Sequence, residues 1–243
     1  MKYGILGDIH GNLSALETAL AGFRDEGCDR ILSVGDVVGY GAAPSECISL
    51  LRENDATVVM GNHDAACVGH LDDQYFNPFA REAVAWTRAA LSREELDWLA
   101  KLPYVATLEH CQVAHGTLHE PEAFHYMLEM YDALPSLDIL ERPVGFVGHT
   151  HIPLSVFRYA DNEQFGYTTD DTIDLRDTER AMINVGSVGQ PRDENPKTAF
   201  AVYDSDARQA RILRAEYDHE VESRRIMGAG LPQVLADRLR LGV

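Results

Sequence analysis

The sequence has few cysteines, and their spacing suggests neither a disulfide nor a redox motif. Cys28, Cys47, Cys67 and Cys111 are widely spread and form no Cys-x-x-Cys pair. Such spacing is typical of reduced thiols in a cytosolic protein. We therefore expect no disulfide and a cytoplasmic location.

Long apolar runs are missing as well. No stretch of the sequence reaches the roughly 18 consecutive apolar residues that a membrane-spanning helix requires. The apolar run near the N-terminus, residues 3–6, is too short for the core of a signal peptide. We expect neither a membrane-spanning segment nor export by this route.

Basic residues are outnumbered by acidic ones. There are 21 Lys and Arg against 39 Asp and Glu, which gives a formal net charge of −18. Such a field repels polyanions unless metal ions or local cations intervene, so we expect no binding to duplex nucleic acid. Most of the acidic excess is expected on the solvated surface, because a few metal-binding carboxylates cannot account for it.

Strand and helix signals alternate over the first sixty residues. Short apolar runs at residues 3–6, 31–34 and 57–60 predict three strands. Between them, apolar residues recur at helical spacing from residue 13 to a stop at Gly27, and a second helix is expected at residues 45–54. This order predicts parallel strands in an open sheet, which binds ligands beyond the carboxyl ends of its strands.

The rest of the chain predicts a helical pair and further strands. Residues 79–102 have a helical pattern, which we interpret as an insertion at about residues 70–103 of a single domain spanning residues 1–243. Residues 161–179 are polar and acidic and predict a hairpin or loop, and residues 216–241 predict a helical tail interrupted near Gly228 and Pro232. Six more strands are expected at residues 104–108, 112–114, 144–147, 154–157, 182–185 and 199–203.

Polar side chains follow the three N-terminal strands, each after a glycine or close behind one. Asp8 and His10 follow the first strand, Asp36 the second and Asn62 the third. An Asp-x-His tripeptide alone is weak evidence, because it also occurs as a helix cap beside a hydrogen-bonded histidine, and a lone Asn is more often a turn residue. The repetition favours metal ligands, because three parallel strand ends converge on one crevice.

Histidines end two later apolar runs in the same way. His115 follows one of them, and the His149-x-His151 pair directs two imidazoles to one side of an extended chain. Two carboxylates, one amide and four imidazoles suit Mn, Fe, Zn, Co or Ni better than Ca or Mg. A single tetrahedral zinc would leave ligands unused, so we expect two divalent ions about 3.5–4 Å apart, with manganese as the first candidate.

Together these segments resemble the five ordered sequence blocks of the calcineurin-like metallophosphoesterase family. The resemblance covers residues 7–151, and it implies an α/β fold: a four-layer αββα sandwich of two mixed β-sheets flanked by helices. The blocks are Gly7-Asp8-Ile9-His10-Gly11-Asn12, Gly35-Asp36, Gly61-Asn62-His63-Asp64, His115-Gly116 and Gly148-His149-Thr150-His151.

The resemblance also implies how the ligands divide between the two ions. Asp8, His10 and His151 hold one ion; Asn62, His115 and His149 hold the other; and Asp36 bridges them. Two cations lower the pKa of a water between them, supply hydroxide at neutral pH and neutralise the phosphate oxygens.

The resemblance implies that His63, which lies beside Asn62 but outside the ligand set, is the general acid for the leaving group. The alternative for His63 is a hydrogen bond that supports a ligand. Asp36, as the bridging ligand, is the second candidate catalytic residue.

Departures from the family pattern favour one branch. In the protein serine/threonine phosphatase branch the second block continues with an acidic residue and a phosphate-binding Arg, but Gly39 and Tyr40 stand in those places. The third block ends in Asp64 rather than Glu. The chain is more similar to small prokaryotic phosphodiesterase-type members, which share a segment like Asn184-Val185-Gly186-Ser187-Val188-Gly189-Gln190-Pro191-Arg192.

Three residues are candidates for binding the substrate: Asn12 of the first block, and Ser187 and Arg192 of the shared segment. For Ser187 and Arg192, a structural turn with an exposed arginine is an equal alternative. His119 and His125 could line the substrate entrance, although loop histidines usually have no such role.

The function that we expect is hydrolysis of small nucleotide-type phosphodiesters. The alternatives are a phosphomonoesterase or dinucleoside polyphosphate hydrolase, and a binding or scaffold protein that keeps the fold without catalysis. A small phosphate ester is the expected partner. The residue types do not determine the oligomeric state.

Overall fold

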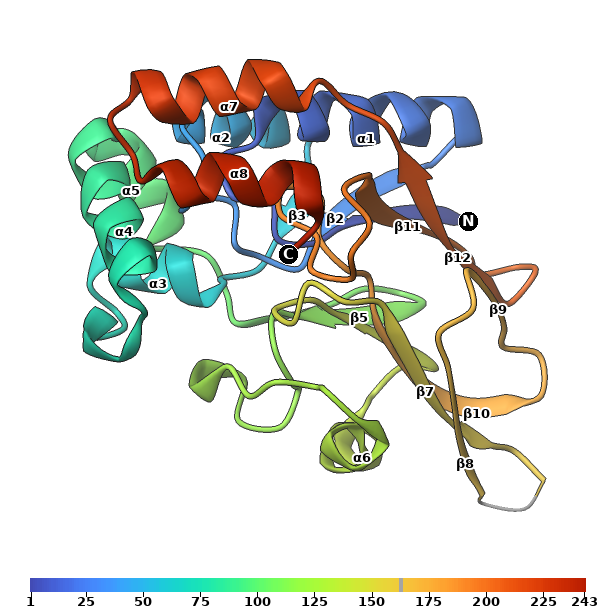
Figure 1. Cartoon of the computed structure of the whole chain (residues 1–243). Helices are drawn as coiled ribbons and strands as arrows, with labels where there is room; N and C mark the ends of the chain where they lie inside the picture. The colour runs from blue at the N-terminus through green and yellow to red at the C-terminus, as the bar shows by residue number, and fades with distance from the viewer. Residues whose placement is uncertain (162–163) are drawn as a thin grey trace.

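The computed structural model describes residues 1–161 and 164–243. Within these residues two six-stranded β-sheets form the centre of the protein (Figure 1). The first sheet consists, in spatial order, of β3 (Thr57–Val58), β2 (Arg30–Ser33), β1 (Lys2–Leu6), β11 (Thr198–Asp204), β12 (Gln209–Ala215) and β9 (Thr172–Asp174). The second consists of β4 (Val105–Thr107), β5 (Cys111–Ala114), β6 (Val144–Val147), β10 (Thr178–Asn184), β7 (Leu154–Tyr159) and β8 (Phe165–Thr168).

Both sheets are mixed. In the first, β1, β2 and β3 are parallel, whereas β11 pairs antiparallel with β1. In the second, β5, β6 and β10 are parallel, whereas β4 and β7 pair antiparallel with their neighbours. Every residue expected to bind metal follows one of the parallel strands β1, β2, β3, β5 and β6. The carboxyl ends of parallel strands lie at the same edge of a sheet, which is where ligands bind in such sheets.

Helices cover the outer faces of both sheets. On the first sheet, α1 (Leu13–Glu26) and α2 (Pro44–Glu53) bury Phe23 and Ile48 in one core with Phe200 of β11. A second core fills the space between the sheets, where Ile5 meets Phe146. On the outer face of the second sheet, α6 (Met130–Ile139) forms a third core. The predicted four-layer sandwich is therefore confirmed.

The start and end of α1 follow from its sequence. The Asn12 side chain accepts a hydrogen bond from the backbone N–H of Ala15 at 3.1 Å, which satisfies a free donor of the first turn. Gly27 ends the helix in the left-handed conformation, with φ of 67°, where a glycine carries no penalty from a side chain. The predicted stop at Gly27 is confirmed.

The helical segment expected after the third strand is present. It contains the 3₁₀ helix η1 (Asp73–Tyr75), α4 (Pro78–Ala90) and α5 (Arg93–Leu99), whereas α3 (Asn62–Val68) precedes it and was not expected. Asn77 caps α4, and a capping box between Ser92 and Glu95 starts α5. The predicted single-domain organisation, with this segment as an insertion, stays a prediction.

The second half of the chain departs from the prediction at several elements. Residues 161–179 do not form one hairpin, because β8 pairs with β7 in the second sheet and β9 with β12 in the first; residues 162–163 lie outside the described part. Neither β12 nor α6 was expected. The interrupted helical tail is confirmed as α7 (His219–Gly228) and α8 (Gln233–Leu241). No helix in residues 1–161 or 164–243 combines the length and apolarity needed to cross a membrane.

Candidate metal centre

The structure brings all seven predicted ligands together. Asp8 and His10 follow β1, Asp36 follows β2, Asn62 begins α3 after β3, His115 follows β5, and His149 and His151 follow β6. None of these side chains is more than 9% exposed. Strands of both sheets therefore contribute to one buried polar site.

The backbone at five of these residues has the left-handed conformation. For a residue with a side chain this conformation costs roughly 1–2 kcal/mol. It is maintained here by hydrogen bonds between the loops, such as that from the His10 N–H to the Asp36 carbonyl at 2.9 Å. Such strain is concentrated at functional sites, where it fixes the direction of a side chain. The positive φ angles are 49° at Asp8, 50° at His10, 53° at Asp36, 70° at His149 and 64° at His151.

Two of the glycines that precede ligands make room for carboxylates that follow other strands. A Cβ atom on Gly61 would lie 2.1 Å from Oδ1 of Asp36, and one on Gly148 would lie 2.3 Å from Oδ2 of Asp8. Both distances are far below van der Waals contact. Gly61 and Gly148 of the repeated glycine-polar pattern thus have a packing reason, because the carboxylate of another block occupies the space that a side chain would need.

Asp8, His10 and His151 form the first ligand group. The Nδ1 atoms of His10 and His151 lie 3.1 Å and 2.6 Å from the carbonyl oxygens of Val38 and Gln190. A carbonyl only accepts hydrogen bonds, so each Nδ1 carries the proton and each Nε2 has a lone pair. The two Nε2 atoms face each other at 3.2 Å. Oδ1 of Asp8 lies 3.5 Å from Nε2 of His151. Facing acceptors without a proton between them suit a bound cation.

Asn62, His115 and His149 form the second group. Nδ1 of His115 lies 2.9 Å from the carbonyl oxygen of Val34, so its Nε2 is directed to the site. That Nε2 lies 3.0 Å from Oδ1 of Asn62 and 3.1 Å from Nδ1 of His149. These three side chains could hold a second cation.

Asp36 lies between the two groups. Its Oδ1 accepts a hydrogen bond from the backbone N–H of His63 at 2.8 Å. Its Oδ2 lies 3.6 Å from Nε2 of His10 and 3.4 Å from Nε2 of His115, and thus faces one ligand of each group. Burial opposes the charge of Asp36, but the imidazoles of His115 and His63 outweigh it and hold the pKa of the carboxyl well below its usual range. The donor set therefore fits two cations with one bridging carboxylate.

Protons occupy part of this site when metal is absent. Burial raises the pKa of Asp8 to about 7, against the effect of the His115 charge. Burial acts to lower the pKa of His115, but the carboxylates of Asp36 and Asp8 outweigh it and raise that pKa to about 9. At neutral pH the metal-free site therefore holds a proton on His115 that a cation must displace.

Metal binding at pH 7.5 should release about one proton per chain, because the His115 imidazole is protonated below its pKa of about 9 and must lose that proton to bind metal. Metal affinity should therefore rise as the pH increases toward 9 and fall in acid. Calorimetric titration with manganese in two buffers of different ionisation enthalpy measures the release. An observed enthalpy that is the same in both buffers would contradict this account of the metal-free site.

His63 lies beside the two groups. Its ring is 4.9 Å from that of His10, 4.5 Å from that of Tyr40 and 4.9 Å from that of Phe76, measured between centroids. With His10 and Asp36 it also forms a third possible cation site. Its Nδ1 is buried and has no hydrogen-bond partner among the described residues. Burial lowers the pKa of His63 to about 4.

Gly39 leaves no room for a side chain against Nδ1 of His63. A Cβ atom on Gly39 would lie 2.4 Å from Nδ1 of His63, and Gly39 has a φ of +89°. A side chain at this position would therefore displace the imidazole. The departure from the phosphatase branch noted in the sequence thus has a direct steric consequence at the site.

Arg192 lies at the edge of the candidate metal centre and has a hydrogen-bond donor without a partner among the described residues. Its Nη2 donates to Oε1 of Gln190 at 2.9 Å and to the Tyr40 hydroxyl at 3.4 Å. Its Nε is buried and unpartnered within the part of the chain that the structure describes. The ring of Tyr40 lies 4.7 Å from that of His10. An anion held near His10 could therefore satisfy the free Arg192 donor.

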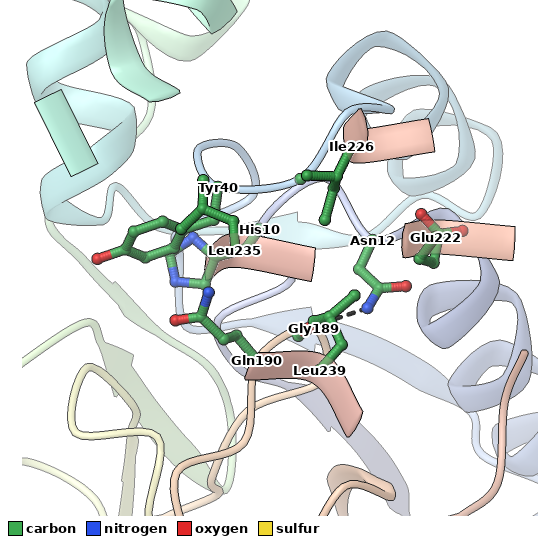
Figure 2. A pocket seen from close by; sticks show the side chains of 10 residues that line it. His10, Asn12, Tyr40, Gly189, Gln190, Glu222, Ile226, Leu235 and Leu239 are labelled. Atoms are coloured by element: carbon green, nitrogen blue, oxygen red, sulfur yellow. Dashed lines mark hydrogen bonds between the residues drawn. The ribbon is translucent and has the colours of Figure 1, made fainter. Parts of the chain in front are cut away.

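Asn12 already uses its side chain within the fold. Its oxygen caps α1, and its nitrogen donates to the Gly189 carbonyl at 2.9 Å (Figure 2). The same nitrogen also donates to the Tyr217 hydroxyl at 3.1 Å. Asn12 therefore connects the loop after β1 to residues near the C-terminus. Its contact with substrate stays a prediction.

Ser187 is similarly engaged. Its hydroxyl donates to the Asp8 carbonyl and accepts from the Gln190 N–H, both at 2.8 Å. Ser187 thus joins the backbone of a ligand to the segment that carries Arg192. Its predicted contact with substrate also stays a prediction.

The C-terminal helices close one side of the site. Leu235 and Leu239 of α8 and Ile226 of α7 line a small cavity beside His10 and Tyr40 (Figure 2). Its volume is about 10 Å³, which is room for about one water molecule. A substrate must therefore approach the metal centre from another side.

Sequence reasoning missed the groups that orient the ligands. The carbonyls of Val34, Val38 and Gln190 belong to the backbone, so residue type carries no signal for them. Tyr126, whose ring stacks on that of His149 at 3.9 Å and 12°, lies in a loop where the sequence shows no periodic pattern. The three aromatic residues Phe124, Tyr126 and Tyr131 within eight positions are the hint that the sequence offers.

The chain is similar to known proteins over most or all of its length. It is 34% identical to an uncharacterized protein of Methanocaldococcus jannaschii, with 98% of this chain and 97% of that one covered. It is 27% identical to the phosphodiesterase YfcE of Escherichia coli K12, with 85% and 89% covered. A metallophosphoesterase crystal structure from Sphaerobacter thermophilus superimposes with a TM-score of 0.85 at 38% identity, covering 100% and 99%.

The family match covers most of the sequence. A profile described as the calcineurin-like phosphoesterase superfamily domain matches residues 1–208, which include every predicted ligand, and leaves α7 and α8 outside it. Because this match extends from β1 beyond β11 and the relatives align almost from end to end, the chain belongs to the calcineurin-like phosphoesterase superfamily and is a metal-dependent phosphoester hydrolase.

Proposed function

We propose that this protein hydrolyses small nucleotide-type phosphodiesters with two divalent cations, manganese being the first candidate, and with His63 as general acid. The observation that carries the proposal is the position of Asp36, whose Oδ2 lies 3.6 Å and 3.4 Å from one histidine of each ligand group. The similarity to the Escherichia coli phosphodiesterase supports the substrate class.

The residues of the chain have separate tasks. Asp8, His10 and His151 would hold one cation; Asn62, His115 and His149 would hold the other; and Asp36 would contact both. When bound, the cations supply an activated water and neutralise charge on the phosphate oxygens.

His63 would donate a proton to the oxygen of the leaving group. The rings of Tyr40 and Phe76 pack against the His63 imidazole and hold its orientation. Arg192 would bind a phosphate oxygen through its free donors, and its flat guanidinium suits two hydrogen bonds to one phosphate.

The surroundings of His63 favour a diester over a monoester. The position that carries a phosphate-binding arginine in the serine/threonine phosphatase branch is Tyr40, whose hydroxyl accepts a hydrogen bond from Arg192. Position 39 cannot supply a carboxylate to Nδ1 of His63, because a Cβ atom there would lie 2.4 Å from that nitrogen. The acidic residue and the phosphate-binding arginine of the serine/threonine phosphatase branch are therefore both missing beside His63.

Two nitrophenyl esters test the proposal directly. With the manganese-loaded protein, kcat/KM should be higher for bis-p-nitrophenyl phosphate than for p-nitrophenyl phosphate. A large preference for the monoester would replace the proposal by a phosphomonoesterase. Hydrolysis of neither ester by protein that carries two metal ions would favour the scaffold alternative.

The metal is tested by removal and reconstitution. Chelation followed by dialysis should abolish hydrolysis, and adding back Mn, Fe, Zn, Ni or Co separately should rank the ions by restored kcat. Imidazole-rich sites accept all five, so the proposal predicts activity with several ions and the highest with manganese. We also propose a cytoplasmic location, which the four free cysteines support.

Replacing Arg192 with Ala should lower kcat/KM for the diester about 10- to 100-fold, since a hydrogen bond to a charged group contributes about 1.5–3 kcal/mol. Arg192→Lys should restore only part of the loss, because an ammonium cannot reproduce the guanidinium fork. Steady-state kinetics measure both variants. Arg158→Ala is the control, because Arg158 on β7 is also partly buried but pairs with Glu179 and Asp138. An Arg192→Ala enzyme with unchanged kcat/KM would remove Arg192 from substrate binding.

A further inference from the structure

A groove opens next to the second ligand group, between the loop that follows His115 and helix α6. The loop contains the 3₁₀ helix η2 (Pro121–Ala123). The groove has a volume of about 410 Å³, within the range of small-molecule sites. It is lined by Thr117, His119, His125, Tyr126, Leu128, Tyr131, Asp132 and Pro135.

Tyr126 connects this groove to the metal centre. One face of its ring lies against the ring of His149, with centroids 3.9 Å apart and planes 12° apart. The side chain is nevertheless 50% exposed, so much of the ring is open. A group that enters the groove therefore reaches an aromatic surface in direct contact with a predicted metal ligand.

The groove is already shaped before anything binds. The hydroxyl of Ser136 on α6 accepts hydrogen bonds from the backbone N–H groups of Leu118 and His119 at 3.0 Å and 3.3 Å. Oδ2 of Asp132 accepts from the N–H groups of Leu128 and Glu129, both at 2.9 Å. These bonds tie both ends of the loop to α6, so little ordering remains to oppose binding.

The lining suits an uncharged planar group. Tyr131 and Leu128 are each 67% exposed, a high value for such large apolar side chains. The described residues that line the groove include no Lys or Arg, and one of them is the acidic Asp132. A chain of phosphates would be repelled here, whereas the flat face of a nucleobase stacks on tyrosine rings.

We propose that this groove binds the nucleobase of the substrate, with the base against Tyr126 and Tyr131 and the phosphate at the metal centre. The inference rests on the proposed phosphodiesterase function and narrows it to esters that carry a nucleoside. It assigns Tyr126 and Tyr131 as specificity-determining residues, and Asp132 as a carboxylate near the polar edge of the base.

Two diesters with the same leaving group test the proposal. The p-nitrophenyl ester of thymidine 5′-monophosphate and methyl p-nitrophenyl phosphate have the same charge and release the same phenolate, so they differ in the nucleoside. The manganese-loaded protein should hydrolyse the nucleoside ester with a kcat/KM roughly tenfold or more above that of the methyl ester, the size expected for stacking of one base.

Alanine variants of the two tyrosines should reduce the ratio of kcat/KM for the nucleoside ester to kcat/KM for the methyl ester. Tyr131→Ala and Tyr126→Ala should each bring it close to one, whereas Tyr131→Phe should keep it, because the ring alone stacks. Tyr167→Ala is the matched control: Tyr167 on β8 is 66% exposed, much like Tyr131, but lies outside the groove. Its ratio should equal that of the wild type. Partial unfolding of a variant lowers kcat/KM for both esters by the same factor, so it leaves the ratio unchanged.

Each outcome bears on one of the two claims. If the metal-loaded protein hydrolyses neither ester, the proposed function fails. If it hydrolyses both with equal kcat/KM, the function stands and the groove proposal is overturned. A nucleoside preference that survives both alanine variants would also overturn it, because the base would then bind elsewhere.

Discussion

Replacing Asp36 with Asn should lower kcat/KM for a phosphodiester by at least about a thousandfold, and the protein should retain fewer than two metal ions per chain. The amide can still accept the hydrogen bond from the His63 N–H, so the local backbone is kept. It loses the negative charge that faces His10 and His115. Losing several kcal/mol of charge stabilisation corresponds to a rate loss of this size.

Asp64→Asn separates this effect from the loss of a buried carboxylate. Asp64 is also fully buried, but its oxygens accept hydrogen bonds from the N–H groups of Gly61, Val37 and Val38 rather than facing the ligand histidines. An amide NH₂ facing these donors should destabilise the fold by about 1–3 kcal/mol while both ions stay bound. Metal analysis and thermal unfolding of the two variants measure the difference. Two tightly bound ions in Asp36→Asn would contradict the bridging role.

Replacing His63 with Ala should slow hydrolysis about 10²- to 10⁴-fold for a diester with an alkyl leaving group, and much less for a p-nitrophenyl ester. An alkoxide needs a proton to leave, whereas p-nitrophenolate leaves readily without one. Burial lowers the pKa of His63 to about 4 in the free site, so the imidazolium depends on the negative charge of the bound phosphate.

The measurement is kcat for a series of aryl and alkyl diesters with wild-type and His63→Ala protein. The slope of log kcat against the pKa of the leaving group should be steeper in the variant. Metal analysis is the control, because His63 also lies within ligand distance of His10 and Asp36. Parallel slopes with full metal content would remove His63 from the acid role.

The first half of the fold was predictable because local signals agree there. Alternating apolar runs and helical spacing mark β1, α1 and β2, and the glycines mark where each strand ends. The same glycines carry the site, since Gly61 and Gly148 admit the carboxylates of Asp36 and Asp8. The apolar run at residues 57–60 predicted a strand, and β3 occupies only the first two of these residues, Thr57–Val58.

The second half was less predictable because its pairing is non-local. Residues 165–168 and 172–174 are adjacent in sequence but join different sheets, and β9 pairs with β12 more than thirty residues away. Pro135 lies within α6 and weakens the local helical signal. The helical tail was expected, but local patterns cannot place α8 over Tyr40.

Within the candidate site, residue types predicted the donors but carried no signal for their orientation. The tautomers of His10, His115 and His151 are set by backbone carbonyls, which any residue could supply. The stacking of Tyr126 on His149 depends on a loop whose shape is fixed by Ser136 and Asp132. Sequence therefore predicted which side chains come together at the candidate metal centre, and the structure was needed to find the groove beside it.

The measurement that tests the metal centre most directly is anomalous diffraction from crystals grown with manganese. The account predicts two peaks about 3.5–4 Å apart. One should contact Asp8, His10 and His151, the other Asn62, His115 and His149, and the Asp36 carboxylate should contact both. A single peak, or two peaks that do not share Asp36, would contradict it.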